Sequence, residues 1–335
     1  MIDHIRSTVA GGDLSLEQMQ EAVAAIMDGQ ASPAQVAALL IALALKGETA
    51  DEIAGAAAAM RRHAIPVRAR RHPIVDVCGT GGDASGTFNI STAVAFVVAG
   101  RGVAVAKHGN RAMSSRCGSA DVLEALGVRI DTPPEQAGAV LDAVGIVFLF
   151  AQTFHPAMRY VAPVRREIGV RTLFNVIGPL SNPAGAHRQV VGVPREPLLR
   201  LVASALGRLG SERAAAVLGE GGLDEIGLSG PSRVAEWTGT QVKEYEIDPR
   251  TFGIALRPTS ALAGGDATHN AKIVQTVLAG ERGPHRDVVL LNAALALEIA
   301  GAAANMQAGL EAAAQAIDSG GAQARLDALV QATNA

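Results

Sequence analysis

The sequence predicts an α/β protein in which a small all-helical domain precedes a larger domain with a mostly parallel central sheet. Three observations carry this prediction. The N-terminal stretch repeats apolar residues at helical spacing, and from Ile74 onward short apolar runs alternate with segments of helical length. The chain also has 335 residues, which exceeds what a single core usually fills. We expect a helical domain at 1–70, joined by helices from about 156–183 that pack back on it, and an α/β domain at 71–155 and 184–335.

Four helices are expected before residue 65. Three of them begin at a Ser or Thr that is followed three residues later by Gln or Glu, which is the capping-box pattern. These pairs are Ser15 with Gln18, Ser32 with Gln35, and Thr49 with Glu52. Leu39, Leu40 and Leu43 belong to apolar stripes that exceed what one antiparallel helix pair needs. We therefore expect a homodimer that forms through this domain.

The remaining elements follow from apolar runs and their boundaries. Strands are expected at 74–78, 103–106, 146–150, 189–193 and 214–218, with an antiparallel pair at Val234–Trp237 and Val242–Ile247. Helices are expected at 90–100, 120–126, 134–144 with a cap at Thr132, 197–209, 269–280, 287–303, 306–317 and near the C-terminus. The polar stretch from His155 to Pro183 is too long for a simple crossover, so we expect it to form the helices that pack on the first domain.

A glycine-rich turn connects the first predicted strand to a helix. Gly79, Gly81 and Gly82 follow the strand, Asp83 adds a carboxylate, and Asn89 stands at the predicted N-cap of the helix. Glycines let the backbone approach a ligand closely, and the N-terminus of a helix attracts anions. The turn therefore predicts a phosphate-binding cradle, although an ordinary tight turn also fits the pattern.

A dinucleotide site and a P-loop are two further interpretations of this turn. Residues 79–84 fit the loose G-x-G-x-x-A pattern, but that fingerprint expects an acidic residue after the next strand to hold a ribose diol. The next strand instead ends in Lys107 and His108, and a cation there suits phosphate. The P-loop pattern G-x-x-x-x-G-K-[ST] does not occur in the sequence. A phosphate or diphosphate ligand is the better prediction.

Two further polar loops are predicted at the same edge of the sheet. The loop 107–119 follows a buried strand and ends at Ser119, a predicted helix cap, and the loop 219–225 follows another strand and ends in Asp224 and Glu225. In open α/β sheets, ligands bind along the carboxyl edge of the strands. Mg²⁺ is typically held by one or two carboxylates together with phosphate oxygens, so the two adjacent acids predict a magnesium site.

Arginines and cysteines give weaker signals. The polar stretch holds four arginines, which are Arg159, Arg165, Arg166 and Arg171. Guanidinium groups match carboxylates, although a solvated charge is the ordinary role for most arginines. Cys78 and Cys117 have no base nearby in the sequence, so we expect both to be small packing residues.

Composition argues against several classes of protein. The net charge of −3 and a pI of about 6.3 leave no electrostatic footprint for nucleic acid. The apolar runs are too short or too interrupted to span a bilayer, and residues near Met1 lack the pattern of a secretory signal. Two cysteines cannot make a disulfide framework. We expect a cytoplasmic protein with no nucleic-acid or membrane partner.

Several motifs together resemble the anthranilate phosphoribosyltransferases of tryptophan biosynthesis. They are GTGGD and NIST within 76–92, KHGNRAMSSRCGSADVLEALG at 107–127, HPAM at 155–158, VRREIGVRTLFNVIGPLSNPAG at 164–185 and GLDE at 222–225. The resemblance runs over nearly the whole chain, with mild departures at Gly227 and Arg159, where serine and lysine are common. It implies a nucleoside phosphorylase/phosphoribosyltransferase-like fold and a homodimer. It also implies transfer of the phosphoribosyl group of 5-phosphoribosyl 1-diphosphate to the amine of anthranilate, with release of diphosphate.

The same resemblance implies the site residues. For the phosphoribosyl diphosphate these are Gly79, Gly82, Asp83, Thr87, Asn89, Ile90, Ser91, Thr92, Lys107, His108, Gly109, Asn110, Arg111, Ala112, Met113, Ser114, Ser115 and Ser119. For anthranilate they are Gly79, Asn110 and Arg165. For Mg²⁺, of which two ions are expected, they are Ser91, Asp224 and Glu225.

Two other functions stay open at this point. The pyrimidine nucleoside phosphorylases share the architecture and a KHG-type turn, and would use free phosphate and a nucleoside. A non-catalytic nucleic-acid-binding relative would present a basic groove, which the net charge and the Asp224–Glu225 pair disfavour. For the transferase we expect no obligatory side-chain base, because the aniline nitrogen is neutral near pH 7. An essential His108 or His155 would contradict this.

Overall fold

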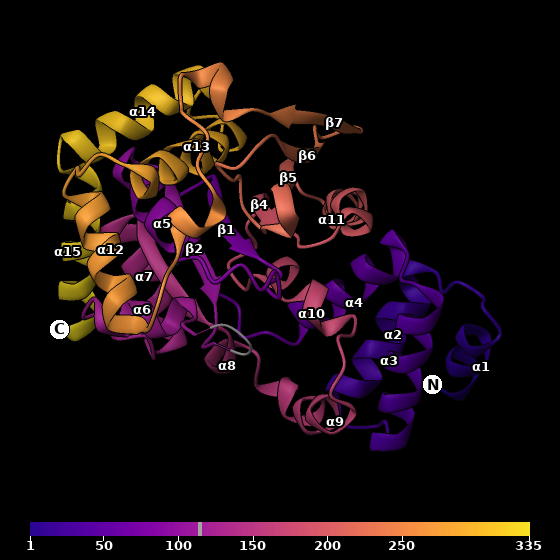
Figure 1. The fold of residues 1–335 in the computed structure, drawn as a ribbon. Coiled ribbons are helices and arrows are strands. Elements are labelled where there is room, and N and C mark those ends of the chain that lie inside the picture. The colour runs from indigo at the N-terminus through magenta and orange to yellow at the C-terminus, as the bar shows by residue number, and fades with distance from the viewer. Residues whose placement is uncertain (113–115) are drawn as a thin grey trace.

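The N-terminal part of the chain, as far as Arg62, forms a helical unit beside a larger α/β unit (Figure 1). The structure is a computed structural model that describes residues 1–112 and 116–335. The helical unit contains α1 (Ile2–Val9), α2 (Leu16–Met27), α3 (Pro33–Lys46) and α4 (Ala50–Arg62). All three predicted capping boxes are formed, at the starts of α2, α3 and α4. The predicted fold class is confirmed.

Seven strands form one sheet in the order β3-β2-β1-β4-β5-β6-β7. The strands are β1 (Ile74–Gly79), β2 (Ala104–Gly109), β3 (Ile146–Phe150), β4 (Arg188–Gly192), β5 (Arg213–Leu218), β6 (Ser232–Trp237) and β7 (Val242–Ile247). The first five pair in parallel, and β6 and β7 add an antiparallel edge. Because β1 lies between β2 and β4, the strand order reverses at β1, and a crevice is expected at the carboxyl ends there.

Helices cover both faces of the sheet. They are α5 (Ile90–Gly100), α6 (Ser119–Ala125), α7 (Pro134–Val144), α11 (Glu196–Arg208), α12 (Ala267–Leu278), α13 (Pro284–Ile299), α14 (Met306–Asp318) and α15 (Gly321–Asn334). Short 3₁₀ turns lie at Glu220–Gly222, Pro249–Phe252 and Thr259–Leu262. Within the described residues, no helix combines the length and the apolar character that crossing a bilayer requires.

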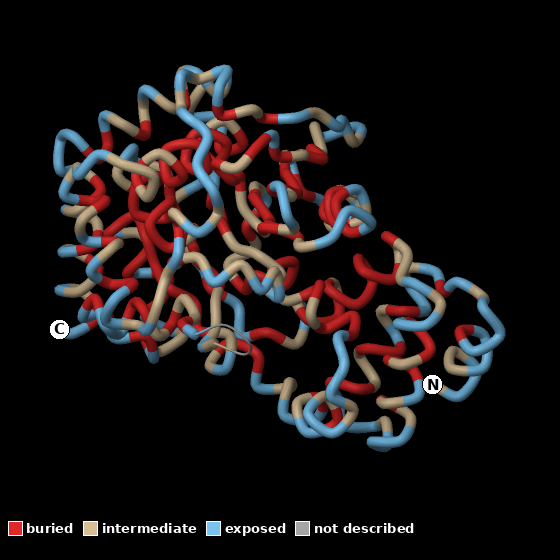
Figure 2. Tube along the Cα trace, in the orientation of Figure 1, coloured by how far each residue is buried: buried red, intermediate tan, exposed pale blue. Residues whose placement is uncertain are grey.

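Two hydrophobic cores lie on the two faces of the sheet at β4 and β5, and the first of them also contains both faces of β2 and β3. The alternation along β4 shows how the strand divides them, because Val190 belongs to one core and Val191 to the other. The first core contains α5 and α13, and the second contains α11 together with the helices of the N-terminal unit. Figure 2 shows buried residues running from the sheet into the inner sides of α2, α3 and α4. An apolar layer therefore packs the helical unit against the side of the sheet that carries α11.

The polar stretch after β3 folds into short helices that lie between the two units (Figure 1). They are α8 (Ala151–Phe154), a 3₁₀ turn at Pro156–Tyr160, α9 (Ala162–Ile168), α10 (Phe174–Ile177) and a 3₁₀ turn at Pro179–Ser181. Helix α9 contacts α3, and α10 contacts α4. The division at 70, 155 and 184 stays a prediction.

This stretch covers the apolar stripe that the sequence assigned to a partner. Leu39 and Leu43 are fully buried and Leu40 is 1% exposed, so all three are buried inside one chain. Val164 of α9 belongs to the same core. The three leucines are therefore wrong as candidates for an exposed dimer surface. On α3 the exposed apolar residue is instead Leu45, whose surface is 83% accessible.

Three predicted helix caps differ in the structure. Asn89 stands at the N-cap of α5 but makes no capping hydrogen bond, because its side chain bonds to Cys117 and Asn270 instead. Thr132 is buried two residues before α7, and its hydroxyl donates to the Arg129 carbonyl. Ser119 is the first residue of α6 and not its cap. Local patterns predict where these helices start, whereas tertiary contacts take the polar side chains elsewhere.

Candidate active site

The loop after β5 reaches across to the glycine turn after β1. The Gly81 N–H donates to Asp224 Oδ2 at 3.1 Å. A Cβ added at Gly79 would overlap the Asp224 carboxylate, and one added at Gly192, the last residue of β4, would overlap the Asp224 backbone carbonyl. These two strand ends therefore require glycine because the acidic loop crosses directly over them.

Three carboxylates gather at this crossing. Asp83 lies near enough to Asp224 to raise its pKa, and Glu225 is adjacent in the sequence. Burial raises the pKa of the Asp224 carboxyl, and the charge of Asp83 raises it further. Burial likewise raises the pKa of Glu225, with Asp224 as the next cause and Lys107 opposing both. Excess negative charge in a buried place indicates a site for a cation.

The same crossing includes the start of α5. The Ser91 hydroxyl lies 3.2 Å from Lys107 Nζ, and the Ser91 backbone N–H faces the Glu225 carboxylate. Ile90 and Thr92 are buried in the core behind it. The structure therefore brings three predicted metal residues, Ser91, Asp224 and Glu225, to the end of one buried lysine.

β1 and β2 separate before they reach the site. They pair only at Ile74–Ala104 and Val75–Val105, whereas β2 stays paired with β3 as far as Gly109. The separation leaves backbone groups of β2 without strand partners on that side. Buried backbone groups must find other hydrogen-bond partners, so side chains are expected to fill the gap.

The side chains of Asp76 and Asn182 fill the gap between β1 and β2. Asp76 Oδ1 accepts from the His108 N–H at 3.2 Å, and Asn182 Nδ2 donates to both Asp76 Oδ2 and the Ala106 carbonyl at 2.8 Å. Lys107 Nζ adds a third link by donating to the Val77 carbonyl at 2.7 Å. Burial raises the pKa of Asp76 to about 6, with the Lys107 charge opposing the shift. Asp76 and Asn182 thus fix the backbone that carries Lys107 and His108.

The loop 107–119 is organised by Asp121. Its Oδ2 accepts from the N–H groups of Ala112 at 2.9 Å and Gly118 at 2.8 Å, and its Oδ1 accepts from Arg111 at 3.1 Å. The backbone hydrogen bonds are the larger reasons that the pKa of Asp121 is low, against the opposing effect of burial. Ser119 donates to the Asn110 carbonyl. The predicted phosphate residues Met113, Ser114 and Ser115 lie outside the described residues.

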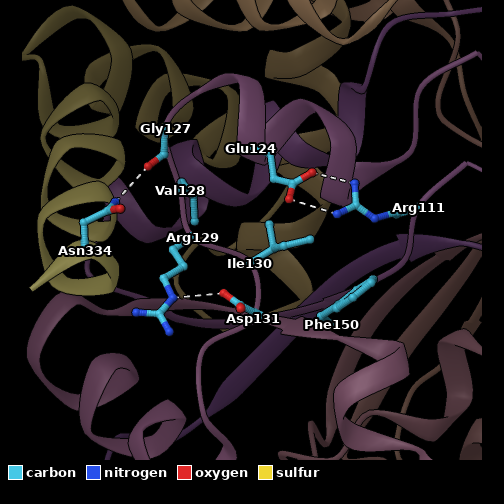
Figure 3. A pocket seen from close by; sticks show the side chains of 9 residues that line it. All are labelled: Arg111, Glu124, Gly127, Val128, Arg129, Ile130, Asp131, Phe150 and Asn334. Atoms are coloured by element: carbon cyan, nitrogen blue, oxygen red, sulfur yellow. Dashed lines mark hydrogen bonds and ion pairs between the residues drawn. The ribbon is translucent and has the colours of Figure 1, made fainter.

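Arg111 is paired with the carboxylates of α6. Its guanidinium lies beside Glu124 of α6, with Nη2 donating to Glu124 Oε1 at 2.9 Å (Figure 3). The groove beside this pair has a volume of about 370 Å³ and is bounded by α6, Phe150 and Asn334. Of the predicted ligand-binding residues that the structure describes, Arg111 alone lines the groove. The groove therefore lies apart from the crossing of the loops.

Two buried histidines stand next to each other behind the second loop. The ring centroids of His108 and His155 are 5.0 Å apart, and neither Nε2 has a hydrogen-bond partner within the described part of the chain. Burial lowers the pKa of His108 to about 3, and the neighbouring His155 lowers it as well. Burial also lowers the pKa of His155 to about 4. Both rings are neutral at physiological pH, which argues against a protonated role.

The predicted acceptor residues come from three parts of the fold. Gly79 ends β1, Asn110 follows β2, and Arg165 lies on α9 with its guanidinium 5.8 Å from the centroid of the Phe174 ring. The Asn110 side chain accepts from the Arg111 N–H and from Gln152. No hydrogen bond or ion pair joins Arg165 to Asn110 or Gly79 among the described residues; its charged neighbour is Arg171, on the next loop.

Thr87 and Gly109 are two further predicted ligand-binding residues. Thr87 forms an isolated bridge with Ala263, and its hydroxyl lies 3.2 Å from that of Ser85. A Cβ at Gly109 would overlap Ser119, which explains the glycine there. Sequence reasoning missed Asp76 and Asn182 as organisers of the site. The sequence feature that could have identified Asp76 is its carboxylate within an apolar strand. A charge buried there needs hydrogen-bond partners from other parts of the chain.

Comparisons with known proteins agree with this arrangement. The family described as "Glycosyl transferase family, a/b domain" matches residues 71–323, and the "Glycosyl transferase family, helical bundle domain" matches residues 2–64. The anthranilate phosphoribosyltransferase of Moorella thermoacetica is 55% identical over 326 residues, which cover 97% of this chain and 96% of that protein.

Solved structures of anthranilate phosphoribosyltransferases are similar to this chain over nearly its whole length. The crystal structure of anthranilate phosphoribosyltransferase from Thermus thermophilus superposes with a TM-score of 0.95 and 46% identity, covering 99% of this chain and all of that one. The Saccharomyces cerevisiae enzyme, solved in complex with PRPP and Mg, gives a TM-score of 0.90 at 28% identity, covering 99% and 97% of the two chains. A structure of the same yeast enzyme with 4-fluoroanthranilate gives 0.88 at 27% identity with the same coverage. Together with the match over residues 71–323, these similarities show that the chain belongs to the anthranilate phosphoribosyltransferase family.

Proposed function

We propose that this chain transfers the phosphoribosyl group of 5-phosphoribosyl 1-diphosphate to the amine of anthranilate, giving N-(5-phosphoribosyl)anthranilate and diphosphate. The observation that carries the proposal is the crossing of the acidic loop over the glycine turn, beside Lys107. This crossing combines backbone N–H groups, a cation and half-buried carboxylates at the edge of the sheet where strand order reverses. A metal-bound diphosphate leaving group needs this combination of charges.

The carboxylates fit a magnesium site. Asp224 and Glu225 are half-buried with raised pKa values, and the described residues contain no group of three His, Cys, Asp or Glu side chains that could hold a metal alone. Mg²⁺ accepts such a site because it keeps water and takes phosphate oxygens from the substrate. Ser91, Asp224 and Glu225 would hold it, with two ions expected. Bound there, the metal would neutralise charge on the departing diphosphate.

The protein's own groups would supply positioning. The glycine turn, the N-terminus of α5 and the loop 107–119 would hold the donor, and Lys107 would add positive charge at its phosphates. Arg165 would bind the anthranilate carboxylate, with Gly79 and Asn110 against the same ligand. Loss of diphosphate leaves an oxocarbenium-like ribose, which the neutral aniline nitrogen can attack directly.

No side-chain base is required in this scheme. The nitrogen becomes acidic only after the new bond forms, so water or a diphosphate oxygen can take its proton. The low pKa values of His108 and His155 leave both imidazoles neutral, but their burial suits them to shape the site more than to exchange protons with water.

A homodimer is the proposed assembly, and the cytoplasm is the proposed location. Leu45 on α3 and Ile2 and Val9 on α1 are exposed apolar residues of the helical unit, 83%, 53% and 70% accessible. Exposed apolar residues grouped on one unit indicate a surface for a partner. A second copy of the chain is the proposed partner.

One assay separates this function from its rival. The product of anthranilate transfer is followed by its fluorescence with 5-phosphoribosyl 1-diphosphate and Mg²⁺ present, and a parallel reaction offers a pyrimidine nucleoside with free phosphate. Turnover only in the first reaction is expected.

In the Arg165→Ala variant, the KM for anthranilate should rise much more than the KM for the donor. Replacing Arg166, an exposed neighbour on α9, with alanine should leave both KM values unchanged. Turnover only with nucleoside and phosphate would refute the proposal.

A further inference from the structure

Arg171 reaches the glycine turn from the opposite side of the site. It lies in the connection between α9 and α10, in the stretch that packs on the helical unit. Its Nη2 donates to the Gly81 carbonyl at 3.1 Å. A Cβ added at Gly82 would overlap the guanidinium itself, and Gly82 has a φ of 77°. The absence of a side chain at Gly82 therefore leaves room for this arginine against the turn.

Arg171 forms no ion pair with a carboxylate of residues 1–112 or 116–335. Burial lowers the pKa of its guanidinium, and the nearby charge of Arg195 lowers it further, against the opposing effect of Asp224. Arg165 also feels the charge of Arg171. Arg171 is thus a positively charged group near two other arginines, and the hydrogen bond that it makes to the glycine turn ends on a neutral carbonyl.

We propose that Arg171 binds the diphosphate group of the donor substrate, as a further ligand-binding residue of the site. This inference rests on the proposed function. A carbonyl oxygen is a weaker partner for a guanidinium than a phosphate oxygen, because hydrogen bonds between charged groups are shorter and stronger. A diphosphate in the cradle would lie on the N–H groups of the same turn that Arg171 already touches. The planar fork of the guanidinium suits two phosphate oxygens at once.

Binding of Mg²⁺ with diphosphate alone tests the inference without the acceptor. Titration calorimetry on the full chain compares the parent with Arg171→Gln, Arg171→Lys and the matched control Arg166→Gln. Loss of one charge-assisted contact predicts affinity for diphosphate that is about tenfold to a hundredfold weaker in Arg171→Gln. Arg171→Lys should recover part of the loss, and Arg166→Gln should match the parent. The KM for the donor should rise by a similar factor in Arg171→Gln, with a smaller effect on kcat.

Thermal unfolding distinguishes a ligand-binding role of Arg171 from a role in the stability of the free protein. The unfolding midpoint of the free protein should be unchanged in Arg171→Gln, while the rise in midpoint on adding Mg²⁺ and diphosphate should shrink. Parent-like diphosphate affinity in Arg171→Gln overturns the inference. So does a lower midpoint of the free variant with equal losses for donor and acceptor. Product formation by the parent enzyme tests the proposed function separately, because diphosphate binding to the parent and its variants is measured without anthranilate.

Discussion

Replacing Gly192 with alanine should disable the site while leaving its side chains intact. Gly192 is the last residue of β4, and its backbone is not in the left-handed region, so alanine causes no conformational strain there. The added methyl group would instead overlap the carbonyl oxygen of Asp224, far inside the 3.0 Å that real Cβ contacts respect. Either β4 or the acidic loop must move to make room.

The size of the effect follows from that overlap. Restoring an ordinary contact requires a shift of roughly 1 Å or more in a close-packed region. Forcing a methyl group into such packing costs about 1–3 kcal/mol of folding stability, or a drop of roughly 2–12 °C in Tm if each kcal/mol is worth about 2–4 °C. A displacement of about 1 Å in a catalytic group costs on the order of a hundredfold in rate, or about 2.7 kcal/mol of activation free energy.

The assay is steady-state turnover of anthranilate, measured at a temperature where the variant is folded, together with its dependence on Mg²⁺. We expect kcat/KM to fall about a hundredfold and the Mg²⁺ requirement to rise, since Asp224 carries the proposed metal site. Gly178→Ala is the matched control, because Gly178 has helical angles and nothing within 4 Å of an added Cβ. Its stability should be unchanged or slightly higher. Parent-like turnover and Mg²⁺ dependence in Gly192→Ala would show that the crossing of Asp224 over β4 is not needed for activity.

Three further changes test separate parts of the structure. Glu225→Gln keeps the side-chain shape and removes its charge, so turnover at saturating Mg²⁺ should collapse by about a hundredfold or more while the protein stays folded; near-parent turnover would refute the metal assignment. His108→Asn should reduce kcat by far less than the roughly 10²–10⁴-fold that an essential base contributes. Because the pKa of His108 is about 3 in the folded chain and near 6.5 when unfolded, only the unfolded state gains a proton just below pH 6.5, and the parent loses stability as the pH falls. This loss of unfolding free energy amounts to about 2 kcal/mol between pH 6.5 and pH 5. The unfolding free energy of His108→Asn, measured with urea, should therefore fall with decreasing pH by about that much less than the parent's. An equal fall in both proteins would mean that His108 is not held neutral. Leu45→Glu should shift the chain to a monomer in sedimentation at micromolar concentrations, and a monomeric parent would exclude the proposed dimer.

The sequence was sufficient wherever the controlling interaction is local. The capping boxes at Ser15, Ser32 and Thr49 involve residues three apart, so the starts of α2, α3 and α4 could be predicted without any tertiary information. The glycine turn after β1 and the two acids of Asp224–Glu225 could also be assigned to the same edge of the sheet. Parallel strands place their carboxyl ends together, whatever the details of packing.

Side chains with long-range partners could not be placed in this way. Asn89 has the composition and position of a helix cap, yet its amide bonds to Cys117 and Asn270, which lie 28 and 181 residues away. Leu39, Leu40 and Leu43 look like an interface because the sequence does not show which elements of the same chain pack on α3, where α1 and α9 are its contacts. Periodicity identifies an apolar face but not the element that buries it.

The amino-acid sequence by itself determined the order of helices and strands, the glycine turn after β1 and the family of the chain, because each depends on residue types at short, fixed spacings. The tertiary structure alone decided how the site is held together. Asp76 and Asn182 meet across 106 residues to fill the gap between β1 and β2, Asp224 crosses over two glycines on different strands, and Arg171 reaches Gly81 from the helical side. These contacts join segments whose separation in space is set by the packing of the whole sheet, so no local pattern encodes them.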